Sequence, residues 1–243
     1  MTGGQGLLAV VAAALLGGPA PPPEAVRPVL TPLPPRLALR APVRTPLPAA
    51  ADLGARLVAP ATLRDAPGGA VVGRVGPRTE FGSPRVLPVV RRQGPWLAVI
   101  ATELANGALG WVPASRVRLV REPVRIDVDL SERELRVVEG GRAVLRMTVG
   151  IGSAATPTPT GWFAVTDGLR GWGPYGCCIV ALSGHQPRLA QGWTGGDRLA
   201  LHGTHVPATV GAADSLGCLR ARSGDMRRLL RLARLGARVH ITG

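Results

Sequence analysis

The sequence predicts a mainly β protein of two small domains, in which a β-barrel precedes a second β domain with one helix near its end. Short runs rich in Val, Leu and Ile recur between turn residues from residue 55 onward. From residue 124, apolar and polar residues alternate with the two-residue period of a strand. The chain has 243 residues, 46% of them hydrophobic, which is enough apolar material for a sizeable core.

Residues 1–20 contain an unbroken apolar run from Leu7 to Leu16. This run is too short to cross a hydrocarbon core of ~30 Å as a helix, but it suits the apolar region of a secretory signal. We therefore expect an exported protein, with the segment acting as a signal peptide or as a retained N-terminal membrane anchor. A disordered alanine-rich tail is the remaining interpretation.

Residues 21–54 form a proline-rich segment, and eleven prolines lie between Pro19 and Pro48. This composition favours extended polyproline conformations, which predicts a disordered, semi-rigid linker. A ligand for a proline-binding module is the less favoured alternative.

Residues 55–120 are divided into β-rich pieces by turn signals, of which the hairpin pair Asn106-Gly107 is the strongest. The pieces predict a small β-barrel. The strands GPWLAV with Trp96 and GALGWVP with Trp111, together with Leu63-Arg64, resemble a bacterial SH3-like domain. The resemblance implies a module that binds cell-wall peptide or supports a catalytic neighbour. We expect at least one of the two tryptophans to be a core residue.

Residues 124–243 predict a second domain that is mainly β. The run RIDVDLSERELRVVEGGRAVLRMTVGIG predicts a hairpin and a third strand, with a turn at Gly140-Gly141. TPTPTGWFAV predicts a turn leading into another strand, and ARVHIT predicts the last strand. Four apolar residues repeat at helical spacing between them: Met226, Leu229, Leu230 and Ala233. Asp225 suits the first turn of this helix, and Gly236 is expected as its C-terminal cap.

The net charge is +14, from 29 basic residues, all of them arginine, against 15 acidic ones. The excess fits either a GC-rich codon bias or attraction to a polyanion such as an anionic cell-wall polymer or a membrane surface. Aromatic residues are few and no run of five basic residues occurs, so we expect no nucleic-acid partner.

Three cysteines are too few for a disulfide framework, and their odd number leaves at least one free thiol in an exported chain. In an extended strand Cys177 and Cys178 point to opposite faces, and a disulfide between neighbours is strained. We therefore predict that both are mostly buried strand residues.

The segment from His202 to Cys218 holds the candidate chemistry. A cysteine reacts as its thiolate, and with an ordinary pKa near ~8.5 it needs a neighbouring imidazole or positive charge to ionise at neutral pH. His202 is the candidate partner. Gly217 lets the backbone approach a carbonyl closely, so the amides of Gly217 and Cys218 are candidate donors to an oxyanion.

The residues alone leave other interpretations open. In one alternative, Cys218 is a structural thiol and His202 is a core residue. In another, Arg220 is only a surface charge. Zinc binding by His202, His205 and Cys218 lacks a fourth ligand and a standard spacing, so we expect no metal site.

LALHGT followed by SLGCLR resembles the signature of the YkuD-type L,D-transpeptidase catalytic domain. Other pieces agree in the same order: IDVDLSERELRVV, VGIGSAATPTPTGWFAV and YGCCIVALSG. The resemblance covers residues 124–243 and implies a β-sandwich with one helix after the catalytic cysteine. It implies Cys218 as the nucleophile, His202 as its general base, and no metal or organic cofactor.

The resemblance also assigns the residues around this pair. Orienting or oxyanion roles are implied for three residues: Ser215, Gly217 and Gly203. Substrate contacts are expected from three more: Arg220, His205 and Tyr175. Trp172 and Trp193 are further candidate walls of a substrate groove, although aromatic residues of a β-rich domain are more often in the core.

The implied substrate is the peptide stem of peptidoglycan, outside the cytoplasm. The cysteine attacks the carbonyl of the third residue of a donor tetrapeptide, expels the terminal D-alanine and forms a thioester, which an acceptor amine or water resolves.

The sequence departs from the family pattern at Leu216, where the family usually has a second histidine. His205 is a candidate to compensate. The departure supports an alternative, an impaired or inactive wall-binding scaffold of the same fold. A papain-like wall hydrolase is disfavoured because there the cysteine precedes the histidine.

Overall fold

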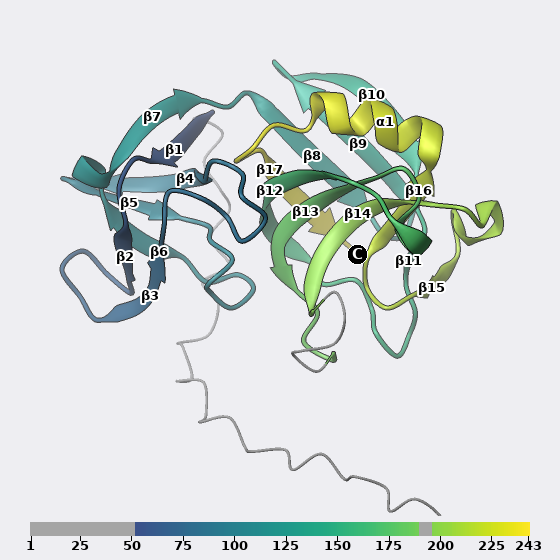
Figure 1. Cartoon of the computed structure of the whole chain (residues 1–243), viewed down its shortest axis with the longest axis horizontal. Helices are drawn as coiled ribbons and strands as arrows, with labels where there is room; N and C mark the ends of the chain where they lie inside the picture. Colours follow the sequence, from purple (N-terminus) through teal and green to yellow (C-terminus); the bar gives the residue numbers. More distant parts are fainter. Residues whose placement is uncertain (1–51, 190–195) are drawn as a thin grey trace, which may run out of the picture. The chain divides into compact units, whose positions relative to one another are not determined.

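The structure is a computed structural model that describes residues 52–189 and 196–243, all of them within one compact unit of the chain. The predicted signal peptide or anchor, most of the predicted linker and Trp193 lie outside the described residues. Within them the chain is mainly β with one α-helix, as the sequence predicts (Figure 1). No helix of the described part is both long and apolar enough to span a bilayer.

Residues 53–121 form a seven-stranded sheet in the order β3-β2-β6-β5-β4-β1-β7. Its strands are β1 (Leu53–Leu57), β2 (Ala61–Arg64), β3 (Val71–Val75), β4 (Val86–Gln93), β5 (Trp96–Val99), β6 (Gly110–Pro113) and β7 (Val117–Arg121). The loop with Asn106 and Gly107 joins the antiparallel pair β5 and β6, as predicted. Trp111 is buried, so the core interpretation holds for this tryptophan, whereas Trp96 is partly exposed. The SH3-like assignment of this sheet stays a prediction.

Residues 124–242 supply an eight-stranded sheet in the order β10-β9-β8-β17-β12-β13-β14-β16. Its strands are β8 (Val124–Asp129), β9 (Glu134–Glu139), β10 (Arg142–Thr148), β12 (Gly161–Arg170), β13 (Cys178–His185), β14 (Arg198–Thr204), β16 (Leu219–Arg222) and β17 (Arg238–Thr242). The short strands β11 (Ile151–Gly152) and β15 (Ala213–Ser215) pair in parallel. Gly140 and Gly141, both with positive φ, form the predicted turn between β9 and β10.

The long strand β12 connects two halves of this sheet. Its residues 161–164 pair with β17, whereas its residues 165–170 pair with β13, with a register shift between Val165 and Asp167. One apolar cluster draws buried residues from both halves and from the helix α1 (Ser223–Leu232). Helix α1 packs against β13 and β14 and buries Met226 and Leu229 (Figure 1). The helix therefore covers strands that carry the candidate site.

The end of α1 differs from the prediction at Gly236. The helix ends at Leu232, and Ala233 is its C-cap. Ala233 has an extended backbone, and its N–H donates to the carbonyl of Leu229. Gly236 lies farther along with φ +84°, and its N–H donates to the carbonyl of Val165, 2.8 Å away. A Cβ at this glycine would collide with Val86, so Gly236 serves a close approach between segments and not the helix end.

Side chains of the first sheet's loops bond directly to the end of β13. Asn106 donates to the carbonyl of His185 at 2.7 Å and accepts from its N–H at 2.9 Å. The ring of His185 lies between the carboxylate of Asp197, at 2.9 Å, and the carbonyl of Thr102, at 2.6 Å. These bonds hold the segment that continues from β13 into residues of the site.

Candidate active site

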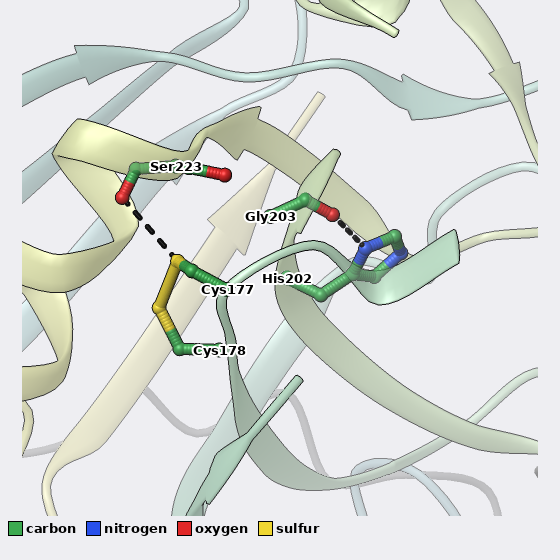
Figure 2. The surroundings of a disulfide bond; sticks show 5 residues. All are labelled: Cys177, Cys178, His202, Gly203 and Ser223. Atoms are coloured by element: carbon green, nitrogen blue, oxygen red, sulfur yellow. Dashed lines mark hydrogen bonds between the residues drawn. A yellow bond between two sulfur atoms is a disulfide. The ribbon is translucent and has the colours of Figure 1, made fainter. Parts of the chain in front are cut away.

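His202 lies in β14 because of the two-residue alternation of that strand. Leu199 and Leu201 point into the apolar cluster, so Ala200 and His202 face the opposite side, where a cavity lies. The side chain of His202 is buried, and its Nδ1 lies 2.7 Å from the carbonyl oxygen of Gly203 (Figure 2). A carbonyl only accepts, so Nδ1 carries a proton, and in the neutral ring Nε2 keeps the lone pair of a base.

Cys218 stands directly before β16, which pairs in parallel with β14 and places Arg220 opposite His202. Its sulfur lies 3.8 Å from the carbonyl oxygen of Arg198 and accepts a hydrogen bond from the N–H of Ala200. The structure thus brings His202 and Cys218 to the walls of the same cavity. Within the described residues, no hydrogen bond joins the sulfur to the imidazole.

The turn before Cys218 is closed by the side chain of Ser215. The buried Oγ of Ser215 donates to the carbonyl of Cys218 at 2.6 Å and accepts from the N–H of Gly217 at 3.0 Å. Gly217 has φ +115°, a conformation that residues with a Cβ rarely adopt. This geometry explains why the sequence has Ser215 and Gly217 at these positions. The N–H of Gly217, one of the two predicted oxyanion donors, donates to Ser215 in this structure. The oxyanion roles of the Gly217 and Cys218 amides stay predictions.

Two threonines of the TPTPTG segment hold the same turn from the other side. Thr156 donates to the carbonyl of Ser215 at 3.1 Å, and Thr158 donates to the carbonyl of Gly217 at 2.9 Å. Both threonines are buried, and Thr158 also accepts from the N–H of Gly152. The sequence marked this segment only as a turn, but its hydroxyls fix the backbone that carries the thiol.

Burial sets the protonation of the pair. Desolvation raises the pKa of the Cys218 thiol, although the Ala200 N–H and the charge of Arg220 both act in the opposite direction. Desolvation also lowers the pKa of His202, against the hydrogen bond to Gly203, and Arg220 lowers it further. Both shifts favour the neutral forms. We expected His202 to ionise the thiol at rest, whereas these pKa shifts favour a neutral thiol and a neutral imidazole at the same cavity.

The cavity has a volume of about 350 Å³ and mainly apolar walls. Tyr175 lines it with its ring edge-on to that of His202, with the ring centroids 5.0 Å apart. Trp172, which is exposed, packs edge-on to Tyr175 at 5.3 Å. The predicted substrate contacts His205 and Arg220 also line the cavity, as does Leu216. The cavity therefore brings together the three residues that were predicted to contact a substrate.

The comparisons with known proteins address this same part of the chain. Residues 123–241 match the family model of the L,D-transpeptidase catalytic domain. Over these residues the chain resembles an L,D-transpeptidase catalytic domain. Two proteins provisionally named L,D-transpeptidase YkuD align with it, from Bacillus licheniformis at 32% identity over 121 residues and from Bacillus subtilis at 29% over 120 residues. Each alignment covers 49% of this chain and 66% of the relative.

Solved structures of L,D-transpeptidases are similar to this chain at lower identity. One from Stackebrandtia nassauensis is 20% identical, with a TM-score of 0.39 and coverage of 51% of this chain and 57% of that one. L,D-transpeptidase 3 of Mycobacterium tuberculosis, in complex with a faropenem-derived adduct, is 17% identical, with a TM-score of 0.43 and coverage of 58% and 75%.

Gly203 allows a backbone segment to lie unusually close to it. A Cβ at Gly203 would lie 3.0 Å from the N of Cys177 and 3.2 Å from the carbonyl oxygen of Tyr175, which is tighter than such contacts usually are. The missing side chain therefore lets the segment with Tyr175 lie against β14, next to His202. The carbonyl of Gly203 also accepts from Nδ1 of His202, so Gly203 orients the imidazole ring.

The same segment corrects the prediction for the neighbouring cysteines. Cys177 and Cys178 form a disulfide, drawn in Figure 2, and Cys218 is the free cysteine of the three. Cys178 is buried at the start of β13, but Cys177 precedes the strand and is half-buried. The expectation that they point to opposite faces assumed that both are in a strand. Since Cys177 lies in the turn before it, its sulfur reaches that of Cys178 and also approaches the carbonyl oxygen of Ser223, at 3.3 Å.

Three residues that line the cavity were not predicted from the sequence. Phe81, from the loop after β3, lines the cavity near the guanidinium of Arg198, which pairs with Glu80. The third is Gln186, whose side chain is buried. No motif marks any of them, because their positions depend on tertiary contacts. The zinc alternative concerned His202, His205 and Cys218, and no group of three or more metal-ligating residues is found within the described residues.

Proposed function

We propose that this protein is a peptidoglycan L,D-transpeptidase that transfers an acyl group through a thioester on Cys218. The carrying observation is that the free cysteine and the buried histidine line one cavity within residues that match the L,D-transpeptidase catalytic domain. The proposed donor is a tetrapeptide stem, whose third residue is the acyl group that is transferred to the sulfur. The proposed acceptor is an amine of a second stem, or water.

The proposed steps use groups that the cavity holds. As the sulfur attacks the carbonyl carbon, the thiol proton passes to Nε2 of His202. When the intermediate collapses, the C–N bond breaks, His202 returns the proton to the departing amine, and D-alanine leaves. The acceptor amine then attacks the thioester, loses its proton to His202 and frees the thiol. A neutral base at rest suits this sequence, since protonated His202 has no lone pair to accept the proton.

The direct experiment is incubation with a purified tetrapeptide stem. We expect D-alanine to be released in step with a cross-linked dimer when an acceptor stem is present, and with a tripeptide when only water resolves the thioester. Cys218→Ala is the matched control, because it removes one sulfur and leaves the cavity. Equal D-alanine release from both proteins would contradict the proposal.

A wall-binding scaffold without chemistry is the second candidate, and Leu216 favours it. Leu216 replaces the expected histidine with a side chain that is 46% exposed at the cavity and cannot donate a proton. The scaffold predicts binding to wall sacculi with no D-alanine release, so the same incubation separates the two candidates.

We also propose export, with the apolar segment Leu7 to Leu16 as signal or anchor and anionic wall polymers as partners of the positive charge. The disulfide between Cys177 and Cys178 supports this location, since disulfides persist in oxidising compartments. The seven-stranded sheet is proposed as an SH3-like module that supports the catalytic domain. Mapping the N-terminal residue of the protein recovered from a wall fraction tests the export.

A further inference from the structure

The attack on a carbonyl places negative charge on its oxygen, and that charge needs donors in fixed positions. The Gly217 amide is not available, because it donates to Ser215 Oγ at 3.0 Å. The Cys218 amide is a single donor. The proposed reaction therefore calls for another N–H that already points toward the turn of residues 215–218.

The side-chain amide of Gln186 lies next to this turn. Gln186 follows β13 directly, is 2% exposed, and lines the cavity together with Cys218. Its Nε2 donates to the carbonyl of Pro157 at 2.8 Å, and its Oε1 accepts from the N–H of Arg188 at 3.1 Å. These two partners settle which end of the amide is nitrogen, since a carbonyl only accepts and a backbone N–H only donates.

The second N–H of Nε2 has no partner among the hydrogen bonds within the described residues. A primary amide carries two donors, and Pro157 accepts only one of them. A buried donor without a partner carries a cost of roughly 1–3 kcal/mol, so such a group calls for an explanation. A substrate oxygen in the cavity would supply the missing acceptor.

The contact with Gly217 places this nitrogen beside the nucleophile. A Cβ added at Gly217 would collide with Nε2 of Gln186, with Cδ and Cγ of the same side chain close behind. Gly217 is the residue directly before Cys218. The glycine therefore has a second effect besides allowing an unusual φ. Its missing side chain leaves the space in which the amide of Gln186 contacts the turn of residues 215–218.

We propose that Gln186 is a catalytic residue that donates the second N–H of Nε2 to the oxyanion, with the Cys218 amide as the other donor. The inference rests on the proposed function. As the S–C bond forms, the π electron pair of the carbonyl moves onto its oxygen, and the two N–H groups stabilise it. Collapse restores the C=O bond and expels the amine, which takes its proton from His202.

Two reactions of the same thiol separate this role from a structural one. Alkylation of Cys218 by iodoacetamide displaces iodide at a saturated carbon and forms no oxyanion. Acylation by a carbapenem opens a lactam carbonyl and does form one. A group that only positions the thiol affects both rates, whereas an oxyanion donor affects acylation alone.

The experiment measures both rates for the full chain, for Gln186→Met and for Gln186→Glu. Met fills a similar volume without a donor, and Glu keeps the acceptor for the Arg188 N–H but loses the NH₂. We expect acylation to fall about 100-fold, as for other oxyanion donors, and alkylation to stay within about twofold. Arg188→Ala is the matched control, because Arg188 bonds to the carbonyls of Ala154 and Ala155 and supplies no donor to the turn. It should leave both rates unchanged.

Each contrary result has a distinct meaning. Equal losses of both rates in the two Gln186 variants would overturn the catalytic role and leave a positioning role. Unchanged acylation in both variants would overturn the inference while the proposed function stands. A wild-type protein that is alkylated but never acylated would instead overturn the proposed function, and the role of Gln186 with it.

Discussion

His202 in β14 lies opposite Arg220 in β16, and this parallel register brings Cys218 to the cavity that His202 lines. Cys218 stands two residues before Arg220, and Ala200 stands two residues before His202. The same register therefore lets the sulfur of Cys218 accept a hydrogen bond from the N–H of Ala200. Thiol and base therefore line one cavity although sixteen residues separate them in the sequence. The charge of Arg220 lowers the pKa of both groups, so one residue affects nucleophile and base together.

The first prediction concerns the pH dependence of thiol alkylation. Because burial raises the pKa of Cys218, the thiolate should appear only at a pH above the ordinary cysteine pKa of about 8.5. The iodoacetamide rate should therefore increase through an inflection above that value. Arg220→Gln should move the inflection to still higher pH, since the charge that lowers the pKa is gone. An inflection near neutral pH in the wild type would contradict the neutral pair.

The second prediction concerns Ser215, whose buried hydroxyl makes two hydrogen bonds within the nucleophile turn. Ser215→Ala leaves the Gly217 N–H and the Cys218 carbonyl without this partner, which should lower the free energy of unfolding by ~1–3 kcal/mol. Chemical denaturation measures the change. The exposed Ser131 bonds to Asp129, and Ser131→Ala should cost less than about 0.5 kcal/mol. Equal effects of the two variants would argue against the role given to Ser215.

The third prediction concerns Leu216. Its exposure at the cavity means that Leu216→His should change the free energy of unfolding by no more than about 0.5 kcal/mol. If the existing site is competent, carbapenem acylation should change by less than tenfold. An increase far beyond tenfold would indicate that this leucine marks an impaired enzyme and would favour the scaffold.

The fourth prediction follows from the pairing of Cys177 with Cys178. Protein denatured without reductant should expose one reactive thiol, that of Cys218, and protein denatured with reductant should expose three. Mass analysis after alkylation counts them. Three thiols without reductant would show that the pair is reduced, as the sequence alone led us to expect.

Local patterns predicted much of the fold. Alternation and glycine turns predicted the hairpins at Gly140-Gly141 and after Asn106, since these features depend on neighbouring residues. Gly236 was misassigned because its φ serves contacts with Val165 and Val86, which lie far away in the sequence. Tertiary contacts of this kind are invisible to a pattern.

The candidate site was predictable where a motif carries it. Cys218, His202 and Ser215 stand in motifs and meet at one cavity, whereas Gln186 and Phe81 have no motif and arrive there through the packing of separate segments. The hydrogen bond of the Gly217 amide was not predictable for a similar reason. A sequence shows that glycine allows a close approach, but it does not show that Ser215 already accepts this N–H.

The central claim is that Cys218 acts as a nucleophile toward an acyl carbonyl. The most direct measurement is the intact mass of the protein after incubation with a carbapenem. The account predicts that the wild type gains the mass of one drug molecule and that Cys218→Ala gains none. A wild type of unchanged mass, or an equal gain in the variant, would contradict it.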